Sequence, residues 1–192
     1  METVVGTVEQ VAVYPVKSLG GRTVRAADVD AAGLRGDRAY AVVDATTGER
    51  LTVRTTPRMR EVVATGDAAA DTGTLTAVLG RPVRLAASAA GPQVDAAAVH
   101  LVSRQAVDRA AAGDVPEGCS AGDPRANLLL DLVDGAADER SWIGRHLHVG
   151  DAVLRLTRLP KHCLGVYAEV VRAGAVAVGD PVRLSGPEPS RG

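Results

Sequence analysis

Short hydrophobic runs separated by turn residues make up most of the pattern along this 192-residue chain. Residues 4–16 are rich in valine and alternate imperfectly with polar residues, which predicts a strand that ends near Pro15. Turn sequences such as GLRGD and TTPRM then separate further short runs, a pattern typical of β structure. These further predicted strands cover residues 23–30, 40–44, 51–54, 61–64, 75–79 and 83–85.

The second half of the chain continues this pattern around one helix. Stretches rich in alanine, glycine and aspartate at residues 64–73 and 86–98 are predicted loops, and the second is the best candidate for a domain boundary. A strand in AVHLVS precedes a helix predicted over residues 103–112, with Ser103 as its N-cap. The later strands are predicted in NLLLDLV, WIG, HLHVGD, AVLRLTRL, GVYAEVV and AVAVGDPVRL.

Composition narrows the kinds of partner. Phenylalanine is absent and aromatic residues make up 2% of the chain, so valine, leucine and alanine have to fill the core. The net charge of −1 provides no electrostatic basis for binding nucleic acid or an anionic membrane surface. The first residues lack the features of a signal peptide, and no run reaches 18 apolar residues. We therefore expect a cytoplasmic protein whose partners are small molecules or other proteins.

One lysine stands out in a chain whose basic residues are nearly all arginine. Lys17 is one of only two lysines, and with Ser18 it lies at a predicted strand-to-turn boundary before two glycines. Backbone N–H groups beside glycines can approach an anion closely. Lys17 and Ser18 could therefore converge with Arg38 and Arg54 on a phosphate. The alternative is that these are ordinary surface charges.

Two polar positions in the second half offer candidate chemistry. Arg125 and Asn127, the chain's only asparagine, precede an apolar strand, which suits recognition of a polar ring edge or a phosphate. A turn-capping asparagine is the alternative. His146 and His148 share one face of a predicted strand, but no third metal ligand lies nearby in the sequence, which favours a solvated strand.

The two cysteines are 44 residues apart, and both are expected to be reduced. Cys163 follows Arg158, Lys161 and His162, and such a positive neighbourhood would lower the thiol pKa and favour a thiolate that binds soft metals. Cys119 has acidic neighbours in the sequence, so it lacks a positive neighbourhood that would favour a thiolate. For each thiol the alternative is an inert, buried side chain.

Seven of these segments resemble, in the same order, motifs of the MOSC superfamily, which is named for the C-terminal domain of molybdenum-cofactor sulfurase. The segments YPVKSLGG, GLRGDRAYAVVD and LTVRTTPRM resemble the β-barrel domain found ahead of MOSC. VHLVSRQAV, RANLLLD, SWIGRHLHVGDAVLRLTRLPKHC and GVYAEVVRAGAVAVGDPVRL resemble MOSC itself. The resemblance implies a mainly β (α+β) fold. It consists of an N-terminal β-barrel-like domain over residues 1–92, packed against a MOSC β-barrel domain over 93–185 with one or two helices. The composition of residues 186–192 predicts a disordered tail.

The same resemblance implies a molybdenum-cofactor (molybdopterin) site in the groove between the two domains. In the amidoxime-reducing members of the family, basic and polar residues of these motifs hold the phosphate and the pterin, and a cysteine ligates molybdenum. The matching residues here are Lys17, Ser18 and Arg38 for phosphate and pterin, Arg54, Arg125 and Asn127 as further cofactor contacts, and Cys163 for molybdenum.

Two features depart from the family pattern. Ala126 stands where the family usually has proline, which removes a rigid turn. The family also carries some tens of residues between the ligand cysteine and the GVYAEV strand, whereas here only Leu164 intervenes. Counted forward from VLRLT, Cys163 is in register with the molybdenum ligand. Counted back from GVYAEV, it matches a position where some relatives have an unrelated cysteine, so both alternatives stay open.

The resemblance implies three alternative functions. The first is an oxidoreductase that reduces N-hydroxylated or N-oxygenated small-molecule substrates, with electrons from a separate redox protein, since the chain has no iron–sulfur or flavin motif. The second is a non-catalytic carrier, either of molybdopterin or of sulfur as a persulfide on Cys163. The third is a scaffold that has lost the site.

Overall fold

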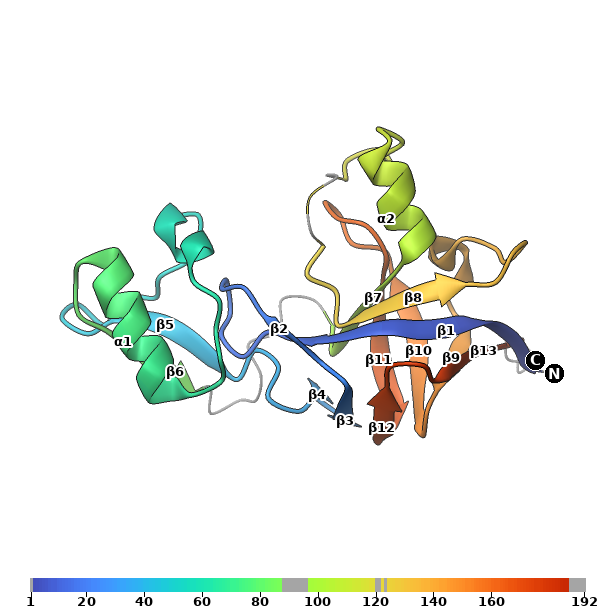
Figure 1. Ribbon diagram of the computed structural model, residues 1–192, viewed down its shortest axis with the longest axis horizontal. Helices are drawn as coiled ribbons and strands as arrows, with labels where there is room; N and C mark the ends of the chain where they lie inside the picture. Colours follow the sequence, from blue (N-terminus) through green and yellow to red (C-terminus); the bar gives the residue numbers. More distant parts are fainter. Residues whose placement is uncertain (1, 88–96, 120–121, 123, 187–192) are drawn as a thin grey trace, which may run out of the picture. The chain divides into compact units, whose positions relative to one another are not determined.

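The computed structural model describes residues 2–87, 97–119, 122 and 124–186 (Figure 1). Their contacts define two compact units. The larger unit comprises Met1–Val11, Val24–Arg35 and Ala96–Gly192, and the smaller comprises Ala12–Thr23 and Gly36–Asp95. The expected domain boundary near residue 92 and most of the expected tail lie outside the described residues. Because the compact units reflect contacts rather than family domains, the division at residue 92 stays a prediction.

A closed barrel of seven strands forms the larger unit (Figure 1). Going round the barrel, each strand pairs with the next, and pairing of the last strand with the first closes it. All these pairs are antiparallel except the parallel pair β7–β8, which α2 connects. In order, the strands are β13 (Pro181–Ser185), β9 (His146–Val149), β10 (Ala152–Arg158), β11 (Val166–Arg172), β7 (Val99–Ser103), β8 (Leu128–Leu132) and β1 (Glu2–Val13).

The barrel core follows from alternation along these strands. Residues such as Leu101, Leu128, Leu156 and Val166 are fully buried, so aliphatic side chains fill the interior without phenylalanine. Outside the barrel, β2 (Arg22–Val24) pairs with β1, and β3 (Ala26–Asp30), β4 (Gly33–Leu34) and β12 (Gly174–Ala177) form a small antiparallel sheet. The mainly β fold class with a β-barrel and helices is therefore confirmed.

The helix predicted beside the barrel is α2 (Arg104–Ala111). Its N-cap is Ser103 as predicted, since the Ser103 hydroxyl accepts a hydrogen bond from the Ala106 N–H at 3.1 Å. The same hydroxyl donates to the fully buried carboxylate of Glu139 at 2.6 Å. Glu139 begins the 3₁₀ helix η2 (Glu139–Trp142), so the strand predicted in WIG is wrong. Asp138 caps this helix by accepting from the Arg140 N–H.

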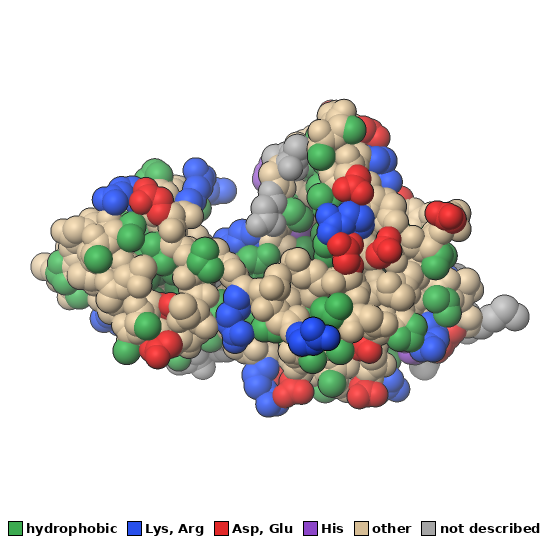
Figure 2. Space-filling model, in the orientation of Figure 1, with side chains coloured by type: hydrophobic (Ala, Val, Ile, Leu, Met, Phe, Trp, Pro, Cys, Tyr) green, Lys and Arg blue, Asp and Glu red, His purple; other side chains and the backbone are tan. Residues whose placement is uncertain are grey.

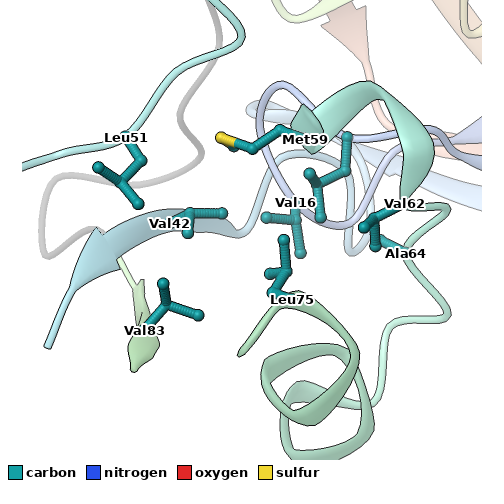
Figure 3. Packing of buried hydrophobic residues seen from close by; sticks show 9 residues of the cluster. Val16, Val42, Leu51, Met59, Val62, Ala64, Leu75 and Val83 are labelled. Atoms are coloured by element: carbon teal, nitrogen blue, oxygen red, sulfur yellow. The ribbon is translucent and has the colours of Figure 1, made fainter. Parts of the chain in front are cut away.

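The smaller unit packs a two-stranded sheet against helices. Strands β5 (Tyr40–Asp44) and β6 (Val83–Ala87) pair antiparallel beside α1 (Ala68–Leu79) and the 3₁₀ helix η1 (Pro57–Glu61). Figure 3 shows its core. The buried side chains that meet there are Val16, Leu19, Val42, Leu51, Met59, Val62, Ala64, Leu75 and Val83.

Helix α1 corrects two predictions, the loop at residues 64–73 and the strand at 75–79. The Asp67 side chain accepts from the Ala69 and Ala70 N–H groups, and Gly80 ends the helix in the left-handed conformation. The strands predicted at residues 51–54 and 61–64 are also wrong. Residues 53–55 turn, and of residues 61–64 only Val63 forms an isolated bridge.

On the face drawn in Figure 2, basic and acidic side chains are interspersed, as expected for a net charge of −1. Of the helices that the structure describes, none combines the length and the apolar character needed to cross a membrane.

Candidate functional site

The YPVKSLGG stretch of the smaller unit is built around a short parallel pairing with residues 38–40. The Lys17 N–H donates to the Tyr40 carbonyl at 2.8 Å, and the Tyr40 N–H donates back to the Pro15 carbonyl at 3.2 Å. The Arg38 N–H donates to the Tyr14 carbonyl at 2.7 Å. These bonds put Lys17 and Arg38, which are 21 positions apart in the sequence, on adjoining segments.

Arg38 is held in place by Asp37 and Tyr14. Its guanidinium pairs with the buried Asp37 carboxylate, and its Cζ lies 5.2 Å from the centroid of the Tyr14 ring. The other Asp37 oxygen accepts from the Tyr14 N–H at 2.8 Å. With a side chain only 14% exposed, Arg38 is a fixed charge rather than a solvated surface arginine.

Gly21 shows why this stretch ends in glycine. A Cβ atom added there would lie 2.6 Å from the Val13 carbonyl oxygen and 2.8 Å from Cε1 of the Tyr14 ring. The sequence predicts that the chain turns at the two glycines, but the turn lies earlier. It spans Val16 to Leu19, where the Leu19 N–H donates to the Val16 carbonyl at 3.2 Å, and Gly20 forms a bridge with Val63.

Ser18, Arg38 and Arg125 share an unusual backbone conformation. Their φ angles are 73°, 49° and 53°, and among the described residues other than glycine no others have positive φ. Holding a non-glycine residue there costs on the order of 1–2 kcal/mol, and such strain concentrates at functional sites. All three residues are among the cofactor contacts that the motif resemblance implies.

In the larger unit, Cys163 lies in the loop between β10 and β11, partly buried. Burial raises the pKa of its thiol, the nearby Cys119 raises it further, and a hydrogen bond from Tyr167 and the charge of Arg140 act in the opposite direction. The prediction that its sequence neighbours lower this pKa is therefore wrong. Lys161 and His162 are exposed, and Arg158 lies 5.9 Å from the Tyr167 ring centroid.

Beside Cys163, three side chains form a row across neighbouring strands. Arg158 pairs with Tyr167 across β10 and β11, and Tyr167 pairs with His100 across β11 and β7, so all three share the outer face of the barrel. The two rings lie 4.9 Å apart. His100 Nε2 hydrogen-bonds to the Leu164 carbonyl at 2.8 Å, directly after Cys163. No local sequence pattern marks His100 and Tyr167, because only the strand register brings them to this loop.

Asn127 is nearly fully buried and ties this row to β8. Its side-chain oxygen accepts from the His100 N–H at 3.1 Å, and its own N–H donates to the His100 carbonyl at 2.7 Å. These bonds extend the β7–β8 pairing, so the structural role of Asn127 is to join two strands rather than to cap a turn. Nearby in the sequence, Arg125 has two guanidinium nitrogens, Nε and Nη2, that are fully buried.

The predicted site residues therefore divide between the units. Arg54 is exposed in the turn at residues 53–55 of the smaller unit, and its role stays a prediction. His148 lies 3.4 Å from the Glu2 carboxylate, and the part of the chain that the structure describes contains no cluster of three potential metal-ligating His, Cys, Asp or Glu residues. The smaller unit contributes Lys17, Ser18, Arg38 and Arg54, and the larger contributes Arg125, Asn127 and Cys163.

The closed barrel with its helices defines the class of this chain as a mainly β, β-barrel protein. The chain belongs to the family of the MOSC N-terminal beta barrel domain, whose model matches residues 5–119. This family is associated with the molybdenum cofactor.

One solved structure supports the fold, and a second is only distantly similar. The YuaD protein of Bacillus subtilis is similar, with a TM-score of 0.55 and 15% sequence identity over 96% of this chain and 97% of that one. A second structure, described as a hypothetical protein, has a TM-score of 0.49 and 13% identity over 96% of this chain and 70% of that one. A search of the curated proteins finds no match.

Proposed function

We propose that this protein binds the molybdenum cofactor. The observation that carries the proposal is the positive φ of Ser18, Arg38 and Arg125. These are three of the six residues that motif resemblance implies as cofactor contacts, and a scaffold without a site would have no reason to retain strain at all three. Membership of the MOSC family supports the same proposal.

The donor set suits this cofactor. A pterin carrying a phosphate needs fixed positive charge and N–H donors, which Lys17, Arg38 and Arg125 supply. Ser18, Asn127 and Arg54 are further proposed contacts. Molybdenum favours a soft thiolate, and Cys163 is the proposed ligand. Because burial raises the pKa of Cys163, the hydrogen bond from Tyr167 and the charge of Arg140 are needed to favour its thiolate.

The finer proposal is an oxidoreductase acting on N-hydroxylated or N-oxygenated compounds. Reduction of a hydroxylamine consumes two electrons and two protons and releases the amine and water, and the bound cofactor would supply the oxygen-transfer chemistry. Two cysteines are too few for a four-cysteine iron–sulfur cluster, so the electrons would come from a separate redox protein. In this reaction Arg38 and Lys17 would hold the anionic end of the cofactor, and His100 and Tyr167 would position the loop that carries Cys163.

The test is the molybdenum and pterin content per chain after expression in a molybdenum-sufficient host. Lys17→Ala and Arg38→Ala should lower both contents, whereas Arg84→Ala, an exposed arginine on β6 of the same unit, should leave them unchanged. Cys163→Ala should lower molybdenum more than pterin. Equal contents in all five proteins would reject the assigned contacts.

A carrier is the second candidate function. It is favoured by the short connection between β10 and β11, which runs only from residue 159 to residue 165, because loops usually wall a substrate pocket. In this case Cys163 would hold sulfur as a persulfide. Intact mass measurement would show the addition of one sulfur atom, absent in Cys163→Ala, in a protein without molybdenum.

A further inference from the structure

The two cysteines, 44 residues apart in the sequence, are neighbours in the larger unit. The Cys119 thiol donates a hydrogen bond to the Cys163 carbonyl at 3.1 Å. His162 Nδ1 lies 3.3 Å from the Gly118 carbonyl oxygen, so contacts join the two loops on both sides of the cysteine pair.

We propose that Cys119 and Cys163 are a modification site, at which a reversible intramolecular disulfide forms under oxidising conditions. Formation of this bond does not depend on the proposed function. Its consequence rests on that function, because a disulfide removes the thiol that would bind molybdenum or carry sulfur.

The reaction balances with a peroxide as the oxidant. One thiolate attacks hydrogen peroxide, the O–O bond breaks, and the cysteine becomes a sulfenic acid while hydroxide leaves and takes up a proton to form water. The second thiol then attacks the sulfenic sulfur, the S–S bond forms, and a second water leaves. Two electrons pass from the thiols to the peroxide. A small dithiol reverses the modification by thiol–disulfide exchange.

Arg140 and an adjoining cavity favour this chemistry. Arg140 Nη1 lies 3.9 Å from the Cys119 sulfur and donates to the Gly165 carbonyl at 3.4 Å. The same positive charge therefore contacts both the segment that carries Cys119 and the loop that carries Cys163. Arg140 and Leu164 also line a cavity of about 210 Å³, which comes near the pair although neither cysteine lines it. Both cysteines are partly exposed, so a small oxidant or reductant can reach them from solvent.

The loops can make the required movement without disturbing the barrel. A disulfide needs a sulfur–sulfur distance of about 2.05 Å, so the hydrogen bond from Cys119 to the Cys163 carbonyl has to break. Cys119 follows α2 in an irregular segment, and Cys163 lies between β10 and β11. Neither residue belongs to the strand ladder, so the change is confined to side chains and loop backbone.

The experiment is treatment of fully reduced wild-type protein with hydrogen peroxide, followed by non-reducing proteolysis and mass spectrometry. The expected products are one peptide pair joined through Cys119 and Cys163, a loss of two hydrogens from the intact monomer, and full recovery with dithiothreitol. Cys119→Ser and Cys163→Ser should instead give a sulfenic acid on the remaining cysteine that dimedone traps.

Two free thiols after oxidation, independent sulfinic acids, or only intermolecular disulfides would overturn the proposal. A parallel measurement on reduced protein separates it from the proposed function. Cofactor content before oxidation tests cofactor binding, and the cross-linked peptide, measured in protein from a host without molybdenum so that no metal occupies Cys163, tests the disulfide.

Discussion

Arg38 lies over the ring of Tyr14, with its Cζ 5.2 Å from the ring centroid, and Asp37 binds both residues. This arrangement explains the local sequence around the candidate lysine. The Tyr14 ring packs against the Arg38 guanidinium, and the Asp37 carboxylate offsets its buried charge. Gly21 leaves room for the Tyr14 ring, because a side chain there would collide with it. Arg38, the candidate phosphate contact, is thus held in position by Asp37 and Tyr14.

Removing the aspartate should destabilise the smaller unit. Asp37→Ala leaves the Arg38 guanidinium buried without this partner and the Tyr14 N–H without its acceptor, so we expect a loss of about 3 kcal/mol in the free energy of unfolding. Asp37→Asn keeps an acceptor oxygen and should cost less. Urea denaturation measures both, and equal stability of Asp37→Ala and wild type would contradict the arrangement.

Two glycine-to-alanine substitutions should have opposite effects. Gly21→Ala forces a methyl group against the Val13 carbonyl and the Tyr14 ring, and should cost about 1–3 kcal/mol of stability. Gly73→Ala lies within α1, where nothing would contact the new methyl group, and should stabilise by about 0.5–1 kcal/mol. Chemical denaturation of both variants gives the comparison. A Gly21→Ala protein as stable as Gly73→Ala would show that the ring does not pack as described.

Backbone strain at Ser18 can be separated from the role of its hydroxyl. Ser18→Gly relieves the positive φ of 73° and should raise the free energy of unfolding by up to about 1 kcal/mol while lowering cofactor retention. Ser18→Ala keeps the strain and loses the hydroxyl, so it should lower retention without the gain in stability. If Ser18→Gly is both no more stable and fully loaded with pterin, the functional interpretation of the strain fails.

The reactivity of Cys163 should depend on pH in a defined direction. Because burial raises the pKa of its thiol, alkylation by iodoacetamide in Cys119→Ser should be slow near neutral pH and should accelerate only above the ordinary thiol range. Tyr167→Phe removes a hydrogen bond that lowers this pKa and should move the midpoint higher. The pH profile of the alkylation rate gives the midpoint directly. A midpoint below the ordinary range would contradict the described burial.

The same shift sets a pH dependence of stability. A thiol whose folded-state pKa is raised contributes stability that is fully present below the unfolded-state pKa and is lost as pH rises through the folded-state pKa. The difference in unfolding free energy between Cys119→Ser and the double variant with Cys163→Ser should therefore shrink in alkaline solution. An unchanged difference across that range would show that burial does not perturb Cys163.

Local patterns predicted the barrel better than they predicted the smaller unit. Barrel strands β7, β9, β10 and β11 follow hydrophobic runs bounded by turn residues, and Ser103 is a direct capping signal for α2. Helix α1 was missed because its alanines, threonines and Gly73 give no helical stripe of large apolar residues. Leu75 is the one α1 residue among the described buried members of the core cluster, and Val78 and Leu79 pack against that cluster only partly buried. The ends of the helix do carry signals, since Asp67 caps its start and Gly80 its end.

The site could be predicted only in part. Motif order identified Ser18, Arg38 and Arg125, but their shared backbone strain is a property of the folded chain. Proximity in the sequence was misleading for Cys163, because exposed neighbours are less important to a thiol pKa than burial and the residues that actually face it. Cys119 and Tyr167 face Cys163 through long-range packing and strand register, which no local pattern contains.

The measurement that tests the central claim most directly is the amount of molybdenum and pterin in wild-type protein purified from a molybdenum-sufficient host. Elemental analysis and pterin fluorescence after oxidation give both values per chain. Cofactor binding predicts about one pterin per chain, and ligation by Cys163 predicts a matching amount of molybdenum. A folded protein that contains neither would contradict the account.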